Sequence, residues 1–251
     1  MREQADVAAL SVAGAGGVGD RHKLFGAEPA RGAGRTFQGS PYESAHMTCI
    51  DLKTAPNVLH TGRLRLESPR PEHAEAFADG VAASMPGLAY VAWGLRPRNI
   101  EWALRFCEDD ARSVAAGTDL VFHVFEVSDG GWAGRIDVHT IAFEDARGEI
   151  GYVGDLRRAG RGLMREASLA VIDLCFGLGF ERIEAMSDAR NARAQHFADS
   201  LGMAREGVLR RHERDGHGEL CDMVLYAVLR PQPAAPAAPP PPIRTAGCPP
   251  R

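Results

Sequence analysis

The sequence lacks paired cysteines and long apolar runs. None of its five Cys residues belongs to a CxxC pair, which argues against a thiolate zinc site and against the disulfide scaffold of small secreted proteins. No apolar run reaches the roughly 18–20 residues of a membrane span, and the first residues lack the apolar core of a secretory signal. We therefore expect a protein of the reducing cytoplasm, with no bound metal and no membrane partner.

Basic charge is not in excess either. The 251 residues include 29 Lys and Arg against 33 Asp and Glu, a net charge of −4, which argues against a protein that coats nucleic acid. Charged residues make up 25% and hydrophobic residues 45% of the chain, as in ordinary globular proteins. A chain of this length holds one domain with appendages or two small domains.

Composition divides the chain into three zones. Residues 1–57 are rich in Gly and Ala and lack hydrophobic periodicity, so we expect a disordered or weakly ordered extension, with Met47 as an alternative start of translation. Residues 58–230 carry the periodic segments and are predicted to form the domain. Residues 231–251 are rich in Pro, which fixes φ and has no amide donor. We expect a disordered tail there; a ligand for an aromatic groove is the alternative.

The first zone contains a match to GxGxxG, from Gly14 to Gly19. A dinucleotide site also needs a following helix, and the Gly and Pro residues between positions 20 and 35 would interrupt one. We interpret the motif as low-complexity sequence. A nucleotide-binding or scaffold protein that uses this run and the Pro-rich tail is a competing hypothesis.

The middle zone alternates between strand and helix patterns. Alternating or β-forming residues predict strands over 63–67, 120–127, 132–141, 149–153 and 181–186. Helical spacing predicts helices that begin near residues 74, 100, 163 and 192. The second helix is expected to be capped by Asn99 and to bury one stripe of side chains: Ile100, Ala103, Leu104 and Cys107. Together these patterns predict a mixed α/β domain.

A Gly- and Arg-rich turn follows the strand over 149–153. It contains Gly154, Gly160 and Gly162, and an amphipathic helix starts at Leu163. Small residues let backbone amides approach a ligand, and the helix N-terminus adds the positive end of its dipole. Arginines at positions 157, 158, 161 and 165 add mobile positive charge. The segment predicts an anion-binding cradle; the alternative is a solvated basic loop, and the P-loop pattern GxxxxGK[ST] is missing.

This order of elements resembles the GNAT N-acetyltransferases, and within them the ribosomal-protein N-terminal (RimJ/RimL-type) branch. The resemblance covers about residues 60–230. Five stretches carry it in the same order: Arg63-Leu-Arg-Leu, Glu149-Ile-Gly-Tyr, Gly160-Arg-Gly-Leu-Met-Arg-Glu-Ala, Asn191-Ala-Arg-Ala with Leu201-Gly-Met203, and the terminal hairpin from Glu206 to Tyr226. It implies the α+β fold of acyl-CoA N-acyltransferases, with a mixed, mostly antiparallel sheet and helices on both faces.

The resemblance also implies acetyl-CoA as cosubstrate and residues that hold it. The strand around Tyr152 and Val153 would pair with the pantetheine arm, and the side chain of Asn191 would reach the same region. Loop amides would bind the pyrophosphate; they belong to Arg158, Ala159, Gly160, Arg161, Gly162 and Leu163.

The cradle departs from the family pattern at two positions. Ala159 stands where Arg or Gln is usual, and Met164 where Gly or Ala is usual. A register shifted to Arg157-x-x-Gly160-x-Gly162 also fits the pattern. The arginine that would meet the ribose phosphate, Arg157 or Arg158, therefore stays open.

The implied reaction is attack of a primary amine, a protein N-terminal α-amine or a small-molecule amine, on the thioester. Amines have pKa values near about 8–10, so a proton acceptor helps at neutral pH. Glu213 is the first choice, because RimL-type members carry a Glu at the corresponding place after Gly207. Glu149, beside the acetyl site, is the second choice, or it recognises the amine. His139 in the preceding strand is the third choice and a candidate substrate contact.

The proton donor for the leaving thiolate, the substrate groove and the oligomeric state are less well defined by the sequence. RimL-type members carry a Ser, suggested to protonate the thiolate, where this sequence has Ala194. The alternative to an active enzyme is therefore a catalytically impaired CoA-binding protein of the same fold, a sensor or regulator. Trp93, Trp102 and Arg96 are expected to line the substrate groove or to serve as core and surface residues. A homodimer is expected by analogy alone.

Overall fold

The computed structural model describes residues 50–91 and 99–232. Its helices are α1 (Ala74–Ser84), α2 (Ile100–Ala116), α3 (Leu163–Gly177) and α4 (Ala192–Ser200). Its strands are β1 (Val58–His60), β2 (Leu64–Glu67), β3 (Leu120–Glu126), β4 (Trp132–Ala142), β5 (Arg147–Gly154), β6 (Arg182–Asp188), β7 (Ala204–Arg214) and β8 (Leu220–Leu229). Short 3-10 turns are η1 (Leu52–Thr54), η2 (Pro71–His73), η3 (Met85–Gly87) and η4 (Leu156–Arg158). The strands and helices predicted for the middle zone are confirmed.

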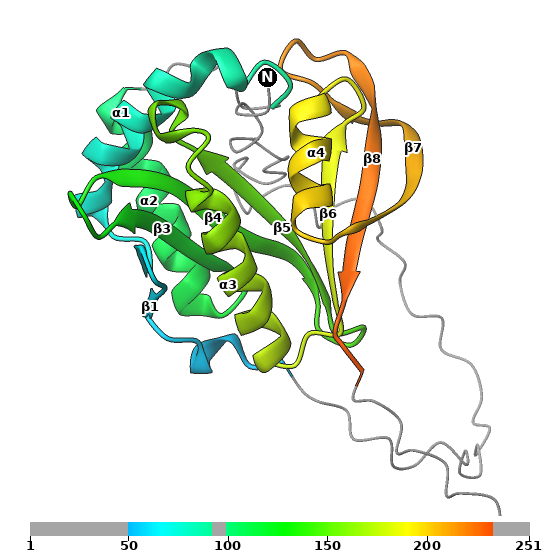
Figure 1. Ribbon diagram of the computed structural model, residues 1–251, viewed down its shortest axis with the longest axis horizontal. Coiled ribbons are helices and arrows are strands. Elements are labelled where there is room, and N and C mark those ends of the chain that lie inside the picture. Colours follow the sequence, from blue (N-terminus) through cyan, green and yellow to red (C-terminus); the bar gives the residue numbers. More distant parts are fainter. Residues whose placement is uncertain (1–49, 92–98, 233–251) are drawn as a thin grey trace, which may run out of the picture.

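One sheet in the order β1-β2-β3-β4-β5-β6-β8-β7 organises the described residues. Neighbouring strands are antiparallel except β5 and β6, which run parallel. β6 follows β5 through α3, the crossover that a parallel pair requires. Beyond their short paired segment β5 and β6 diverge (Figure 1).

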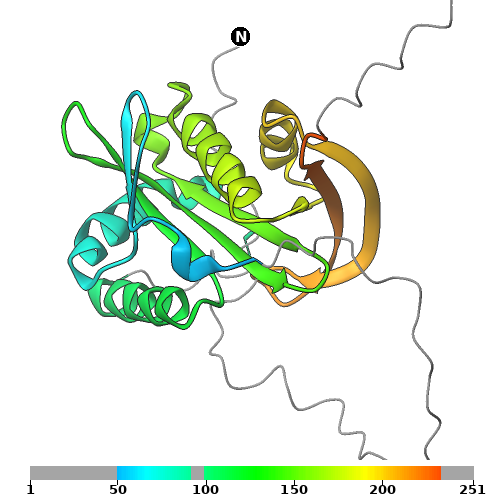
Figure 2. The same cartoon turned by 90° about the horizontal axis from the view of Figure 1, so that it is seen from below.

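Helices cover both faces of the sheet. α3 and α4 lie on one face, and α1 and α2 lie on the other (Figure 2). The first layer encloses a core that includes Tyr152, Val171 and Phe197, and the second encloses Phe77 and Trp132. The expected mixed, mostly antiparallel sheet with helices on both faces is therefore confirmed. Within residues 50–91 and 99–232, no helix has the length and apolar character that crossing a membrane requires.

The folded part begins before the predicted boundary at residue 58. Ile50 and Leu52 are buried in the α3–α4 core, and the side chain of Asp51 caps η1 by accepting from the amide of Lys53 at 3.0 Å. The glycine motif from Gly14 to Gly19, Met47, Trp93, Arg96 and most of the Pro-rich tail lie outside the described residues.

Helix α2 has the predicted cap but a different buried face. Asn99 Oδ1 accepts from the amide of Trp102 at 2.9 Å, as an N-cap side chain does. Ala103 and Cys107 are buried as expected, whereas Ile100 and Leu104 are exposed, 46% and 37%. The buried stripe contains Ala103, Phe106, Cys107 and Asp110 instead. The prediction was wrong for Ile100 and Leu104, because the helix turns Phe106 and Asp110 toward the sheet in their place.

We predict opposite effects for two helical glycines. An ideal Cβ at Gly80 would lie 2.2 Å from Cε3 of Trp132, so Gly80→Ala should force α1 away from the sheet and destabilise the protein by about 1–3 kcal/mol. Gly177 has no atom within 4 Å of its Cβ position, so Gly177→Ala should be neutral or stabilise the protein by up to about 1 kcal/mol. Urea unfolding measures both, and equal stabilities of the two variants would contradict the predicted α1–Trp132 contact.

Candidate active site

The site opens where β5 and β6 separate. The strands pair from Arg147–Arg182 to Glu149–Glu184, and no described strand pairs with this side of β5 beyond Glu149. β5 stays paired with β4 up to Gly154, and β6 stays paired with β8 up to Asp188. The two strands therefore diverge as a V in the sheet (Figure 1). Glu149, in the last pair between them, lies at the apex of this V-shaped opening. Backbone groups along β5 from Ile150 onward are left for a ligand, because such groups need hydrogen-bond partners.

A loop with unpaired amides lies at the wide end of the opening. Gly160 and Gly162 have φ of 76° and 69°, which glycine adopts without strain, and α3 starts directly afterwards. The amides of Arg158 and Ala159 already donate to Asp155 and Leu156 inside η4, at 2.9 and 3.2 Å. Within residues 50–91 and 99–232, the amides of residues 160–163 have no acceptor. These four amides, at the N-terminus of a long helix, form a cradle of the kind that can bind an anion.

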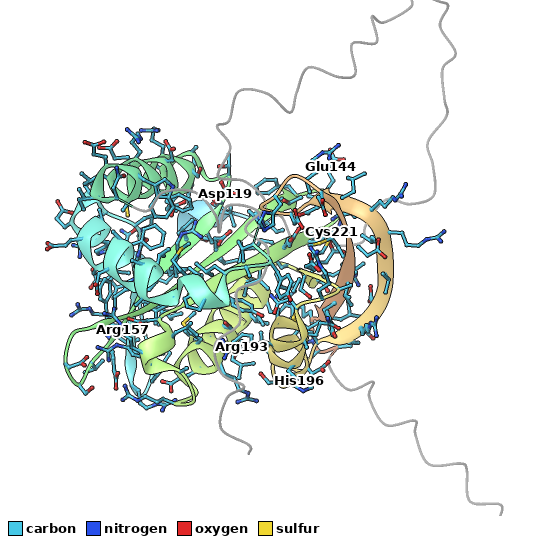
Figure 3. The ribbon with its side chains drawn as sticks, turned by 90° about the horizontal axis from the view of Figure 1, so that it is seen from above. Asp119, Glu144, Arg157, Arg193, His196 and Cys221 are labelled. Atoms are coloured by element: carbon cyan, nitrogen blue, oxygen red, sulfur yellow. The ribbon has the colours of Figure 1, made fainter. Side chains whose placement is uncertain are left out.

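Three of the four arginines near the cradle are paired with carboxylates, and the fourth, Arg165, donates to the Ser200 carbonyl at 2.9 Å. Arg157 binds Asp155 and reaches Asp79 of α1 at 2.7 Å (Figure 3). Glu126 of β3 accepts from Arg158 at 2.5 Å and from Arg161 at 2.7 Å. The bond from Arg161 and that from Arg158 lower the pKa of Glu126, so it stays ionised. The expected mobile positive charge is therefore largely paired, and the backbone amides are the main ligands that the cradle offers.

Helix α4 lies across the opening from β5 (Figure 1). Asn191 caps it: Oδ1 accepts from the amide of Ala194 at 3.1 Å, and the residue is buried. Tyr152 packs its ring against Phe197, with centroids 4.5 Å apart, and burial raises the pKa of its hydroxyl well above the usual range. The Tyr152 side chain is thus a core group, as is that of Val153, and only their backbone groups belong to the unpaired stretch of β5.

The three predicted proton acceptors come together at the apex. His139 and Glu149 are directly opposite on β4 and β5, so their side chains project from the same face. His139 Nδ1 lies 2.9 Å from the Glu149 carbonyl oxygen. Both side chains are buried, and His139 Nε2 and Glu149 Oε1 have no hydrogen-bond partner. Two unpartnered polar atoms at the apex fit a site that receives a polar reactant.

Burial raises the pKa of Glu149 to about 7. The charge of His139 opposes this effect, and the negative charges of Glu213 and Asp137 add to it. A carboxylate with a pKa near neutrality is suited to take and release a proton. Among the candidates, Glu149 therefore combines the position at the apex with the matching proton affinity.

Glu213 reaches this cluster through a distortion of β7. Leu209 pairs with Met223 and Glu213 with Cys221, so the residues between Leu209 and Glu213 face a single residue of β8. Arg211 takes φ of 51° there, and its amide donates to Asp222 Oδ1 at 2.8 Å. This β-bulge re-aims the strand, and the half-buried Glu213 lies close enough for its charge to act on Glu149.

Two further charged residues belong to the site's support and were not predicted. Arg135 and Asp137 precede His139 on β4 at alternate positions and are buried. The signal was present in the sequence, since residues at i, i+2 and i+4 of a strand share one face. Trp102, expected in the groove or in the core, is half-buried and stacks on Phe77 with centroids 5.1 Å apart, against the α1–α2 core. Trp93 lies outside the described residues.

The comparison with protein families agrees with this geometry. The acetyltransferase (GNAT) domain family matches residues 63–204, which include the opening, the cradle and α4. The chain belongs to the GNAT acetyltransferase family. The matched part of this GNAT chain ends at the start of β7, so the hairpin that carries Glu213 lies beyond it.

Individual relatives are distant. The protein named "Uncharacterized N-acetyltransferase p20" of Bacillus licheniformis is 33% identical over 98 residues, which are 39% of this chain. The matched region spans about half, 54%, of that relative. The microcin C7 self-immunity acetyltransferase MccE, solved with acetyl-CoA and AMP, superposes with a TM-score of 0.65 at 20% identity, covering 72% of this chain and 100% of MccE. RimL, the ribosomal L7/L12 α-N-protein acetyltransferase solved with coenzyme A, superposes with a TM-score of 0.63 at 18% identity. The superposition covers 68% of this chain and 97% of RimL. At 20% and 18% identity, the two superpositions show a similarity of fold.

Stability should depend on pH through Glu149. Its folded-state pKa of about 7 exceeds its ordinary 4.5, so the folded protein binds this proton more tightly than the unfolded chain. The contribution of Glu149 to stability therefore falls as the pH rises from about 4.5 to about 7. Glu149→Gln cannot ionise and should gain stability relative to the wild type over this range, on the order of 1–3 kcal/mol. Urea unfolding at several pH values tests this, with the exposed Glu219→Gln as control, and parallel curves for wild type and Glu149→Gln would contradict it.

Proposed function

We propose that this GNAT protein transfers the acetyl group of acetyl-CoA to a primary amine by direct attack of the amine on the thioester. The observation that carries the proposal is the unpaired stretch of β5, which runs from Glu149 at the apex to the four free amides of the cradle. The family match and the fold neighbours that contain acetyl-CoA or CoA support the choice of cosubstrate.

The described residues offer a continuous set of contacts for this cosubstrate. The backbone of Tyr152 and Val153 would pair with the amides of the pantetheine arm in the manner of an added strand. The amides of Gly160, Arg161, Gly162 and Leu163 would bind the pyrophosphate, while those of Arg158 and Ala159 keep η4 folded. Asn191, which starts α4 across the opening, would close the same channel from its other side.

Glu149 is the proton acceptor in this proposal. The amine approaches the apex, forms the C–N bond as the C–S bond breaks, and passes its proton to Glu149. Acetyl-CoA supplies the activated acyl group. Ala194 offers no proton to the leaving sulfur, but a thiol with a pKa of about 8.5 leaves as a thiolate at moderate cost. Holding amine and thioester together supplies much of the acceleration.

A second candidate function follows from Ala194. Its buried methyl group stands where related sequences have the suggested acid, so a catalytically impaired CoA-binding protein, a sensor or regulator, is the alternative. It would bind acetyl-CoA as tightly as an enzyme and acetylate no amine.

We expect the full-length protein to bind acetyl-CoA with micromolar affinity in titration calorimetry. Gly162→Ala puts a Cβ on a residue with φ of 69°, which strains the cradle, and should weaken binding about tenfold or more. Gly117→Ala is the matched control: it has φ of 72° but ends α2 on the opposite face of the sheet, so it should lose similar stability and keep its affinity. Absence of binding by the folded wild type would overturn the acetyltransferase proposal.

Acetylation assays should separate the two glutamates. Fold neighbours described as ribosomal-protein acetyltransferases make peptides with N-terminal Ser or Ala the first acceptors to test, beside small primary amines. Glu149→Gln should reduce kcat/KM by about 10²–10⁴-fold. Glu213→Gln should reduce kcat/KM by a smaller factor than Glu149→Gln. It should also move the acidic limb of the pH profile to lower pH, because the Glu213 charge raises the pKa of Glu149. A larger loss in Glu213→Gln would make Glu213 the proton acceptor.

A further inference from the structure

A row of buried charged and polar residues leads along β4 to the apex. Arg135, Asp137 and His139 share the face of β4 that α2 covers, and all three are buried. Arg135 Nη1 donates to Asp137 Oδ1 at 2.5 Å. Asp137 Oδ2 lies 3.9 Å from His139 Nδ1. The row therefore connects a guanidinium in the core with the imidazole beside Glu149.

The far end of the row is fixed by α2. Asp110 accepts two hydrogen bonds from Arg135, at 2.7 and 2.8 Å, in a bidentate geometry. The Arg135 guanidinium also lies 5.0 Å from the centroid of the Phe106 ring. A buried ion pair seldom adds net stability over apolar packing. The bidentate contact with Asp110 does fix the orientation of the Arg135 guanidinium, because such contacts are directional. The guanidinium in turn holds the Asp137 carboxylate through Nη1.

The near end of the row fixes the imidazole. A carbonyl oxygen can only accept, so His139 Nδ1 carries the hydrogen and donates it to the Glu149 carbonyl at 2.9 Å. Nε2 is left buried without a partner on the face that carries the Glu149 side chain, whose Oε1 is also unpartnered. The backbone bond thus orients the ring and leaves its second nitrogen toward the apex.

We propose that His139 is a positioning residue for Glu149: hydrogen-bonded to the Glu149 carbonyl and 3.9 Å from Asp137, its imidazolium places a positive charge beside the Glu149 carboxylate, which accepts the proton of the amine. This role rests on the function proposed above. It differs from that of a catalytic base, because His139 acts through Glu149 rather than on the amine.

The surroundings explain why such a cation is needed. Four charged groups besides this pair act on His139 or Glu149: Asp119 before β3, Asp137 on β4, Glu184 on β6 and Glu213 on β7. All four are carboxylates, and the nearby Arg135 is already paired with Asp137 and with Asp110 of α2. Burial lowers the pKa of His139, but Asp137 and Glu149 more than offset this and raise it above 6.5. The His139 charge in turn lowers the pKa of Glu149 against the combined effect of burial and the other carboxylates.

The first test is the pH profile of His139→Asn. The Asn amide can still donate to the Glu149 carbonyl but carries no charge. The acidic limb of kcat/KM should move to higher pH by about one unit, with activity at high pH retained. His196→Asn, on the exposed side of α4 (Figure 3), is the matched control and should keep the wild-type profile. An unmoved acidic limb in His139→Asn, or a uniform loss at every pH, would overturn the proposal.

The second test needs no acceptor amine. Side-chain NMR follows the titration of His139 in the wild type, in Glu149→Gln and in Asp137→Asn. The His139 pKa should fall in both variants, because each removes a negative charge that stabilises the imidazolium. An unchanged His139 titration in Glu149→Gln would overturn the positioning role alone. Wild-type kcat/KM in Glu149→Gln would instead overturn the role of Glu149 as proton acceptor. Absence of acetyl-CoA binding by the folded wild type would overturn the proposed function, so the failures are distinguishable.

Discussion

The separation of β5 from β6 is the constraint on which the site depends. β5 pairs with β4 and β6 pairs with β8 over most of their lengths. β5 and β6 pair with each other only as far as Glu149 and Glu184. A sheet that parts in its middle leaves peptide groups without partners in the interior of the molecule, and such groups are rarely left unpaired. The same divergence puts a residue with an acid–base side chain at the apex and a helix N-terminus at the wide end.

The two faces of the sheet serve different purposes. The α3–α4 face is apolar, and Tyr152, Phe197 and Val171 fill it. The α1–α2 face combines an aromatic cluster around Phe77 with the buried pair of Arg135 and Asp110. The bidentate hydrogen bonds of this pair fix side-chain orientation more narrowly than apolar packing does. The apolar layer therefore lies behind Tyr152 and the proposed cosubstrate site, and the polar layer lies behind His139 and Glu149.

Local sequence signals predicted most of the fold and part of the site. Alternation and capping residues predicted the strands and helices, and the glycines predicted the cradle, because each depends on the residue and its near neighbours. The pairing of Arg158 and Arg161 with Glu126 was not predicted, because it joins residues far apart in the chain. The same holds for Glu149: its residue type made it a candidate, but its raised pKa comes from burial and from charges on β4, β6 and β7. The α2 stripe was misjudged because Asp110 is buried only through Arg135.

The β-bulge between Leu209 and Glu213 also bears on the solubility of the protein. β7 is the outermost strand of the sheet, and a long regular edge strand is a template on which other chains can aggregate. Its pairing is irregular at two places, between Arg205 and Gly207 and between Leu209 and Glu213. Exposed charged side chains flank both irregularities: Arg205, Glu206, Arg210 and Arg214. An incoming strand would find no continuous ladder to extend, so the bulge that brings Glu213 near Glu149 also makes this edge a poor template for another strand.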